Sequence, residues 1–457
     1  MNRTMQSEEA FSIVPEKGKQ EEETLWQRYG AERGVWSERM LVALENGVKG
    51  NQWFSLIDKV YADKTLELAW EKVKSNAGSC GIDGITVSHF SKDSQSRLLA
   101  VKEQLRKGEY QPSAAKREWI PKPGSAEKRP LGIPIVKDRV VEAALKMVIE
   151  PIFEREFASQ SYGFRPGRSC KDALGRVEKL LKSGYTQVMD VDIKGYFDSI
   201  PHEKLMERVA ERIADGRVLQ LIDQMLKRGI MEEINKWEPT EEGTPQGGVI
   251  SPLLANIYLN PLDWKLSETG IEMVRYADDI VVLCKSREEA TKAKELVKNW
   301  MEENGLKLHP EKTRMVNMDE PGEYIDFLGY RFRKTNKGRL ARLVRPKSLK
   351  RLRGKLKELT KRTNGNSMEA IIKRINRVTK GWFNYFKQAN AAEHLKIDEW
   401  LRGRLRTILK RRDHREGRAG GRDHPRWPNR YFEQLGYFSL KTARDLLKTN
   451  LRHGVTC

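Results

Sequence analysis

The sequence predicts an α+β protein that continues into a basic, helical C-terminal region. Through residues 26–330, short apolar runs bounded by Gly, Pro or Asp alternate with longer amphipathic stretches, a pattern typical of mixed strands and helices. From residue 345 onward the apolar positions repeat with helical spacing. This change coincides with a jump in positive charge, so we expect a domain boundary near 335–345.

The positive charge is concentrated at one end of the chain. The 457 residues carry a formal net charge of +21, but residues 331–457 hold 36 Lys and Arg against 10 Asp and Glu, whereas residues 1–330 hold 49 against 54. A basic block beside a balanced body predicts a polyanionic partner, most often a nucleic acid. A disordered basic tail is the alternative, but this segment is rich in Trp, Tyr and Phe, which such tails usually lack.

Composition disfavours three classes of protein. No run of 18 apolar residues occurs, so the sequence contains no candidate transmembrane helix. The first 24 residues are polar and lack the apolar core of a signal peptide. The cysteines at 80, 170, 284 and 457 form no Cys-x-x-Cys pair, which disfavours a disulfide framework and a zinc ribbon. We therefore expect a cytoplasmic protein of bacterial type with reduced thiols.

The N-terminal part predicts helices followed by a hairpin. Helical stretches occupy much of 26–75, and the Gly-Ile-Asp-Gly run at 81–84 has the composition of a turn. Two extended segments, 117–123 and 129–136, flank a Gly/Ser turn and predict an antiparallel hairpin. An amphipathic helix is expected near 138–157.

The central part predicts strands that deliver carboxylates. Residues 187–197 predict a buried strand entering a turn, and the period of a strand places Asp190 and Asp192 on one face. Residues 274–284 predict two apolar strands separated by the acidic turn Tyr276-Ala277-Asp278-Asp279. Adjacent carboxylates repel each other, so this turn destabilises the fold unless cations or solvent neutralise it.

An Asp-Asp sequence alone is equally consistent with a plain hairpin turn. The second acidic strand changes that balance, because two such strands can lie side by side in a sheet. Carboxylates that converge from two strands build a two-metal site for phosphoryl transfer, in which ions ~3.5–4 Å apart hold the attacking and leaving oxygens. The sequence therefore favours a metal-dependent phosphoryl-transfer site over a structural turn.

The ordered motifs resemble those of the group II intron-encoded reverse transcriptases and maturases. They are LIDKVY (56–61), GIDGIT (81–86), IPKPG…KRPLGIPIVKDR (120–139), SYGFRPGRS (161–169), VMDVDIKGYFDSI (188–200), GTPQGGVISPLLANIYL (243–259), VRYADDIVVL (274–283), GLKLHPEKT (305–313), FLGYRF (327–332) and GWFNYF (381–386). One short motif is weak evidence, but nine or more in the family's order are specific. The resemblance covers roughly residues 52–457.

The resemblance implies a right-hand polymerase of α+β class, whose fingers and palm contain antiparallel sheet. We expect an N-terminal extension at 1–50, reverse transcriptase fingers and palm at 51–335, an α-helical thumb or maturase (X) domain at 336–400, and a basic C-terminal DNA-binding region at 401–457. The chain ends at Cys457 without the HNH endonuclease domain of some relatives. By resemblance, it is therefore not expected to cut the second DNA strand.

The resemblance also implies the site residues. Asp192, Asp278 and Asp279 match the catalytic carboxylates, and these three with the backbone carbonyl of Ile193 would bind two Mg²⁺ ions, with Mn²⁺ as an alternative. The residues implied for the incoming deoxynucleotide are Lys122, Arg129, Phe197, Gln246 and Lys312. Phe197 would reject a 2′-hydroxyl, and an ordinary core aromatic is the alternative. Lys312 matches a lysine proposed to protonate the pyrophosphate leaving group.

Basic side chains are expected to contact nucleic-acid backbones through phosphates. The candidates are Arg165, Arg168, Lys350, Arg353, Lys357, Arg404 and Arg406. For Arg165 and Arg168, a solvated turn is an equally good interpretation. The expected partners are group II intron RNA, an RNA template with its DNA primer, target DNA and dNTPs. We expect no membrane partner, a monomer or homodimer, and association with the nucleoid during work on DNA.

The leading functional hypothesis is an RNA-directed DNA polymerase that copies intron RNA by target-primed reverse transcription (retrohoming) and promotes intron splicing. The alternatives are an RNA-binding splicing cofactor with an inactive polymerase site, an RNA-dependent RNA polymerase, and a stand-alone reverse transcriptase domesticated for repair or defence. The three catalytic carboxylates argue against the first alternative, and Phe197 with the YADD turn argues against the second.

Overall fold

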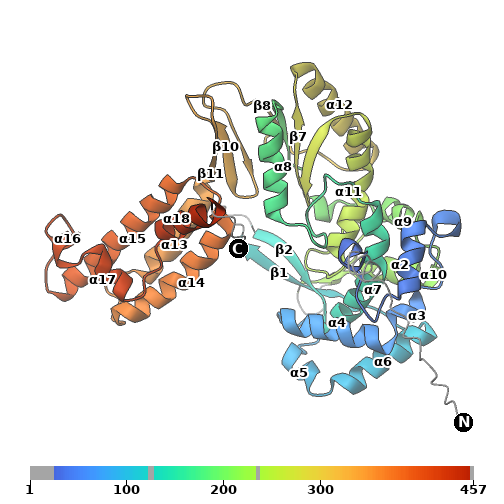
Figure 1. Cartoon of the computed structure of the whole chain (residues 1–457). Helices are drawn as coiled ribbons and strands as arrows, with labels where there is room; N and C mark the ends of the chain where they lie inside the picture. Colours follow the sequence, from blue (N-terminus) through green and yellow to red (C-terminus); the bar gives the residue numbers. More distant parts are fainter. Residues whose placement is uncertain (1–24, 122–127, 233–236, 453–457) are drawn as a thin grey trace, which may run out of the picture. The chain divides into compact units, whose positions relative to one another are not determined.

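The chain folds into two compact units in a computed structural model that describes residues 25–121, 128–232 and 237–452. The first unit contains residues 25–121, 128–177 and 189–314, and the second contains 178–188 and 315–452 (Figure 1). Helices and mainly antiparallel strands occur together, which confirms the α+β class. Within the described residues, no helix is both long and apolar enough to cross a lipid bilayer.

Helix α7 (Val136–Glu156) runs through the core of the first unit and confirms the helix predicted near 138–157. It is buried on almost every face and packs against α4 (Asp63–Asn76). Its buried Asp138 accepts hydrogen bonds from the Tyr110 hydroxyl at 2.7 Å and the Ser113 backbone amide at 2.8 Å. Such partners are required because a carboxylate removed from water is costly unless it is hydrogen-bonded.

The other helices before residue 314 follow in chain order, and all of them except α8 contribute side chains to this core or pack against it. They are α2 (Glu38–Asn46), α3 (Ile57–Val60), α5 (Val87–Ser91), α6 (Ser94–Lys107), α8 (Cys170–Lys182), α9 (His202–Ala210), α10 (Gly216–Lys227), α11 (Ser251–Glu268) and α12 (Arg287–Glu303). Several begin at side-chain caps that satisfy free backbone amides, as Asp215 does for α10 and Ser286 for α12.

The predicted hairpin is present. Strands β1 (Ala115–Pro121) and β2 (Lys128–Ile133) pair antiparallel, with Ile120 opposite Arg129. They belong to a four-stranded sheet of order β2-β1-β4-β5, which β4 (Ile230–Met231) and β5 (Trp237–Glu238) complete. The turn between β1 and β2, including Lys122, lies outside the described residues.

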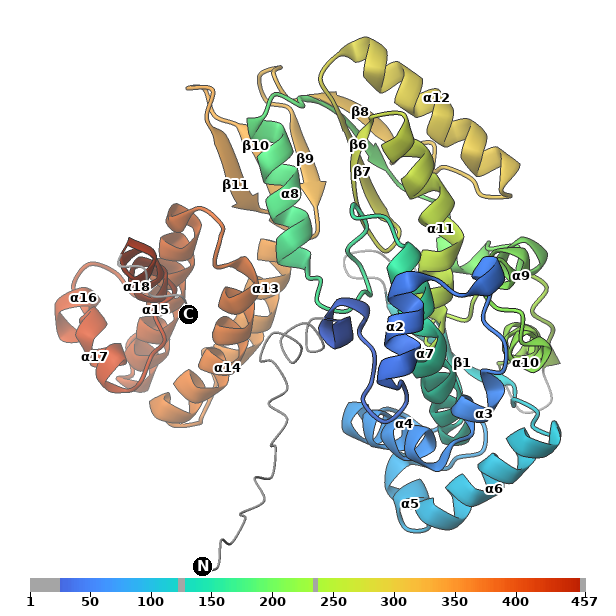
Figure 2. The same cartoon turned by 45° about the vertical axis from the view of Figure 1, so that its right-hand side comes forward.

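A second four-stranded sheet brings the acidic segments together. Its order is β6-β7-β3-β8, where β6 is Glu272–Tyr276, β7 is Asp279–Cys284, β3 is Gln187–Val191 and β8 is Arg314–Asn317. Helix α11 packs against β6 and α12 packs against β7 (Figure 2). Strands β3 and β7 are neighbours although a long stretch of chain separates them, so their carboxylates reach the same place.

The second unit consists of a small sheet followed by helices. Strands β9 (Tyr324–Phe327), β10 (Tyr330–Lys334) and β11 (Leu340–Val344) form an antiparallel meander. The helices are α13 (Pro346–Leu359), α14 (Met368–Phe386), α15 (Ala391–Arg412), α16 (Asp423–Arg426), α17 (Asn429–Gln434) and α18 (Leu440–Arg452). Aromatic side chains such as Phe383, Trp427 and Phe432 are buried in one apolar core. This basic region is therefore folded within residues 315–452.

The boundaries of the polymerase regions remain predictions. The expected boundary at 335/336 falls between β10 and β11, and the one at 400/401 falls inside α15. The compact units divide instead at Arg314 and Met315, at the start of β8. The charge pattern therefore locates the start of the basic helices, whereas the boundary between the compact units is set by which segments pack together.

Buried His394 predicts a pH-dependent weakening of the second unit. Its ring is edge-on to Trp382 and Phe383, and burial lowers its pKa below the ordinary value of 6.5, with a further contribution from Arg444. A lowered folded-state pKa means that the unfolded chain takes up the proton first, so stability is lost as pH falls below 6.5.

We expect urea unfolding to require less denaturant at pH 5.5 than at pH 7.5, with a slope of at most ~1.4 kcal/mol per pH unit from this residue. In the His394→Phe variant the difference between the two pH values should shrink. In the His89→Phe variant, which alters an exposed histidine, the difference should be retained. An unchanged pH dependence in His394→Phe would contradict the assignment.

Candidate active site

The acidic turn between β6 and β7 is a tight hairpin. Tyr276 pairs with Asp279, so only Ala277 and Asp278 form the turn. The common two-residue hairpin turns require a positive φ at their first central residue, and Ala277 has a φ of 59°. Asp278 is half-buried and Asp279 is exposed. This geometry holds the Asp278 carboxylate close to the sheet.

Asp192 lies just beyond the end of β3, the strand beside β7. Its backbone is fixed by residues ahead of β8: the His309 amide donates to the Asp192 carbonyl at 2.8 Å, and the Asp192 amide donates to the Thr313 hydroxyl at 3.3 Å. Burial raises the pKa of Asp278, and the negative charge of Asp192 raises it further. The predicted convergence of these two carboxylates is therefore present.

The site has oxygen donors that suit a divalent cation. The carboxylates of Asp192 and Asp278 meet there, and burial disfavours the charge of Asp278 unless a cation is close. The His309 amide donates to the Asp192 carbonyl, and the Lys194 amide donates to the Lys307 carbonyl. Because Ile193 lies between these two bonded residues, opposite Leu308, its own carbonyl points away from the 307–309 segment. Among the described residues, no group of three Asp, Glu, His or Cys side chains forms a site by itself.

Phe197 and Gln246 lie on segments that are bonded together. The amide of Thr244 donates to the Phe197 carbonyl at 2.6 Å, and the Gln246 side-chain amide donates to Asp198 at 2.9 Å. The Gln246 carbonyl accepts a bond of 2.7 Å from the Gly132 amide in β2. Phe197 is half-buried, so part of its ring can contact a ligand. The β1–β2 hairpin, the turn at Phe197 and the loop at Gln246 are thus joined by hydrogen bonds.

The Gln246 loop is anchored from beneath by a buried ion pair. Glu142 of α7 is within 2.5 Å of Arg228, and both side chains are almost fully buried. Glu142 also accepts hydrogen bonds from the backbone amides of Val249 and Ile250, directly after the loop. A Cβ at Gly247 would lie 2.6 Å from the Gly132 carbonyl, so a larger residue does not fit there.

Two of the predicted cations lie near the carboxylates. Arg129 is exposed on β2, and its charge partly offsets the rise in the pKa of Asp278. The Lys312 ammonium lies 3.6 Å from the Asp192 carboxylate, with a side chain that is 59% exposed. Their predicted contacts with nucleotide phosphates stay predictions. The predicted contact of Lys122 falls outside the described residues.

Arg165 is not placed to bind nucleic acid. Its side chain is only 2% exposed and forms an ion pair of 2.7 Å with Glu154. Its remaining donors bond the carbonyls of Ala158 and Ser161 at 2.6 and 2.8 Å. The prediction of a phosphate contact is corrected, because these partners already use the guanidinium. Arg168 is half-buried and donates to carbonyls of the same loop, so its predicted contact stays a prediction.

The basic residues of the second unit fall into two groups. Lys350, Arg353 and Lys357 are exposed on α13, whereas Leu352 and Leu356 of the same helix are buried, which confirms the predicted apolar and basic faces.

Arg404 and Arg406 of α15 instead serve the fold. Arg406 is 3% exposed and donates to the Trp427 carbonyl at 2.8 Å, and half-buried Arg404 donates to the Thr360 hydroxyl at 2.6 Å. The predicted nucleic-acid contact of Arg406 is corrected, because its buried guanidinium holds neighbouring chain segments together. The predicted contact of half-buried Arg404 stays a prediction.

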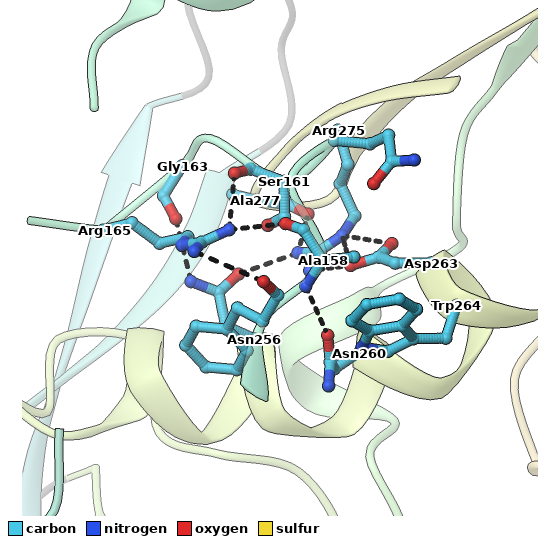
Figure 3. Close-up of polar contacts among 12 residues, drawn as sticks. Ala158, Ser161, Gly163, Arg165, Asn256, Asn260, Asp263, Trp264, Arg275 and Ala277 are labelled. Carbon is cyan, nitrogen blue, oxygen red and sulfur yellow. Dashed lines mark hydrogen bonds and ion pairs between the residues drawn. The ribbon is translucent and has the colours of Figure 1, made fainter. Parts of the chain in front are cut away.

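A buried polar cluster behind the acidic turn was not predicted. Arg275, directly before Tyr276, is fully buried and donates three hydrogen bonds, of 2.8, 3.0 and 2.5 Å, to Asp263 of α11 (Figure 3). It also donates to Asn256 at 2.7 Å. A buried arginine without its acid would cost about 3–5 kcal/mol. The charged residue inside an apolar strand, Met-Val-Arg-Tyr, was the signal in the sequence that could have revealed this cluster.

Comparison with known protein families identifies two regions. Residues 120–332 match the family described as reverse transcriptase (RNA-dependent DNA polymerase), and residues 349–427 match the maturase-specific domain of group II introns. The first region contains the converging carboxylates, Phe197 and Gln246. The second contains most of α13 together with α14, α15 and α16.

Several curated proteins are similar to this chain. Protein YkfC of Escherichia coli is 33% identical over 290 residues, which cover 55% of this chain and 75% of that protein. The group II intron-encoded protein LtrA of Lactococcus lactis is 38% identical over 198 residues, covering 43% of this chain and 32% of LtrA. A protein in the cob intron of Schizosaccharomyces pombe is 40% identical over 198 residues, covering 43% and 24%.

This chain therefore spans about three quarters of YkfC but at most a third of the two intron proteins. Among solved structures, a chain of the partial Cas6-RT-Cas1–Cas2 complex aligns with a TM-score of 0.36 and 24% identity, covering 56% of this chain and 43% of that chain. That structural similarity is too low to support a conclusion.

Proposed function

Because the chain belongs to the group II intron-encoded reverse transcriptases and is thus an RNA-directed DNA polymerase, we propose that it copies intron RNA into DNA and promotes the splicing of that RNA. The observation that carries the polymerase assignment is the meeting of Asp192 and Asp278 at neighbouring strands. The maturase-specific region supports binding of intron RNA. Target DNA, the RNA–DNA duplex and dNTPs belong to the same proposal.

Polymerases of this kind depend on divalent metal ions, and we propose Mg²⁺ at the carboxylates of Asp192 and Asp278. Two such ions would favour ionisation of the primer 3′-hydroxyl and offset charge on the departing pyrophosphate. Asp279 and the Ile193 carbonyl are the further donors of this proposal. The protein's part is to hold these oxygens in place, which the hairpin and the 307–313 segment do.

The cationic and polar residues around the carboxylates orient the nucleotide. Arg129 and Lys312 are placed to contact its phosphates, since a guanidinium and an ammonium both suit phosphate oxygens. Lys312 is also the proposed proton donor to pyrophosphate. The side-chain amide of Gln246 contacts the incoming nucleotide, and hydrogen bonds to Gly132 of β2 and to Asp198 hold its loop in place.

A primer-extension assay tests this function. Purified protein is incubated with an RNA template, an annealed DNA primer, dNTPs and Mg²⁺, and a parallel assay measures splicing of a group II intron RNA. We expect extension that EDTA abolishes, together with faster splicing. If splicing is assisted and no deoxynucleotide is incorporated, the protein is a splicing cofactor, and the polymerase proposal fails.

Phe197→Ala should relax the choice of sugar. The half-buried ring would sit beneath the nucleotide sugar and exclude a 2′-hydroxyl, so removing it opens space for one. We expect the preference for dNTPs over rNTPs, measured as a ratio of kcat/KM values, to fall about 10- to 100-fold. Phe164→Ala, which removes an exposed aromatic ring near the acidic turn, serves as the control and should keep the ratio. Unchanged discrimination in Phe197→Ala would refute the steric role.

A further inference from the structure

The side chain of Asn256 joins two segments that meet at the acidic turn. It lies on α11 and is 1% exposed. Its Nδ2 donates to the Gly163 carbonyl at 2.8 Å, and its Oδ1 accepts from the Arg275 guanidinium at 2.7 Å (Figure 3). A carbonyl can only accept and a guanidinium can only donate, so these partners determine the orientation of the amide. Both ends of the Asn256 side chain are thus used.

Arg275 links Asn256 to the acidic turn. The Arg275 Nη1 that donates to Asn256 also donates to the Ala277 carbonyl at 3.1 Å, next to Asp278. The rest of the guanidinium is held by Asp263 on the same helix as Asn256. Helix α11 therefore fixes the carbonyl of the first turn residue through one buried guanidinium.

Gly163 presses on the turn from the other side. A Cβ on Gly163 would lie 2.3 Å from the Ala277 backbone nitrogen, so the loop and the turn touch without room for a side chain. The same loop is bonded to β6, because the Arg275 amide donates to the Gln160 carbonyl at 3.0 Å and the Tyr162 amide donates to the Arg275 carbonyl at 2.8 Å. Asn256 holds the Gly163 carbonyl and so sets how closely this loop approaches.

We propose that Asn256 is a positioning residue for the polymerase reaction: it fixes the acidic turn between Arg275 and the Gly163 loop and so sets the place of the Asp278 carboxylate relative to Asp192. This proposal rests on the polymerase function proposed above. Asn256 touches no substrate and acts only through the turn. Its loss should lower kcat and weaken the response to Mg²⁺, while the KM for dNTP changes little, because the nucleotide contacts lie on other segments.

The chain offers a matched control one helical turn further on. Asn260 of α11 also uses both ends of its amide: it accepts from the Ala158 amide at 3.1 Å and donates to the Glu156 carbonyl at 3.1 Å. Neither partner is in the acidic turn. Asn256→Ala and Asn260→Ala therefore remove the same group from the same helix, but only Asn256 bonds Gly163 and Arg275, the two residues that contact Ala277 of the turn.

The experiment compares both variants with wild type in primer extension over a range of Mg²⁺ concentrations. A misplacement of ~1 Å can cost about 100-fold in rate, so we expect kcat of Asn256→Ala to fall about 10- to 100-fold, and more Mg²⁺ to be needed for half-maximal rate. Asn260→Ala should remain within about threefold of wild type in both quantities. Equal losses in the two variants, or none in Asn256→Ala, would overturn the proposal.

Hydrogen exchange supplies a measurement that does not depend on activity. Amides in peptides covering 272–284 should exchange faster in Asn256→Ala than in wild type and Asn260→Ala, because the turn has lost a tether. If Asn256→Ala does not fold, Gly163→Ala tests the same contact from the opposite side and should show the same loss of kcat and faster exchange. Normal kcat and exchange in a folded Gly163→Ala would contradict the proposal. Inactive wild-type protein would instead count against the polymerase function.

Discussion

Asp278→Asn is expected to abolish polymerisation without weakening the fold. Losing one charged ligand removes several kcal/mol of transition-state stabilisation, which corresponds to a fall in extension rate of about 10³-fold or more. Burial and the neighbouring Asp192 raise the pKa of Asp278, so folding at neutral pH works against its charge. The neutral amide should therefore leave the thermal midpoint unchanged or higher when both proteins are compared in EDTA.

The two measurements together separate chemistry from stability. Asp190→Asn is the matched control, because Asp190 lies on β3, the strand beside β7, but is 3.6 Å from the Arg314 guanidinium and is not a proposed metal ligand. We expect it to retain most of its extension rate. Intron RNA binding by Asp278→Asn should stay close to that of wild type, since the exposed basic face lies on α13. A lower midpoint accompanied by lost RNA binding would show that Asp278 is structural.

Reversing the exposed charges of α13 is expected to weaken nucleic-acid binding, which Asp278→Asn should leave intact. Lys350, Arg353 and Lys357 are spaced by three and four residues, so they share one face of the helix. If each neutralises one phosphate, the triple Glu variant should lower the slope of log K against log salt by about three and weaken binding by tens to hundreds of fold at physiological salt. Filter binding of intron RNA and of an RNA–DNA duplex at several salt concentrations measures this.

The control changes net charge equally at another place. Lys292, Lys294 and Lys298 are exposed on α12, and their replacement by Glu gives the same loss of positive charge. If overall charge governs binding, the two triple variants should lose affinity alike. If the α13 face is the binding surface, only the first should do so. Unfolding midpoints must be compared, although neither set of side chains contributes to an apolar core.

Much of the site could be predicted because its signals are local. Apolar runs that end in Asp predicted strands with carboxylates at one place, and the structure brings Asp192 and Asp278 together on neighbouring strands. The hairpin at β1 and β2, the helix at α7 and the amphipathic character of α13 also follow from local periodicity. The order of motifs indicated the family, which the comparisons then identified.

Other assignments could not be made from local pattern, because the fate of a charged side chain depends on what packs around it. Arg165 and Arg406 look like surface cations in the sequence, yet both are buried, and Glu154 and backbone carbonyls take up their donors. Conversely, Lys350 and Lys357 lie in an equally basic stretch of sequence, and both are exposed. Net positive charge thus predicts a nucleic-acid partner but does not say which arginines meet it.

The sequence by itself determined the fold class, the two acidic strand ends and the asymmetric charge, since periodicity and composition are properties of neighbouring residues. Only the tertiary structure decided how the acidic turn is held. Arg275, Asp263, Asn256 and Gly163 come from a strand, a helix and a loop, and their hydrogen bonds exist only when these segments pack together. A buried guanidinium needs partners from several segments at once, and no pattern along the chain can specify that meeting.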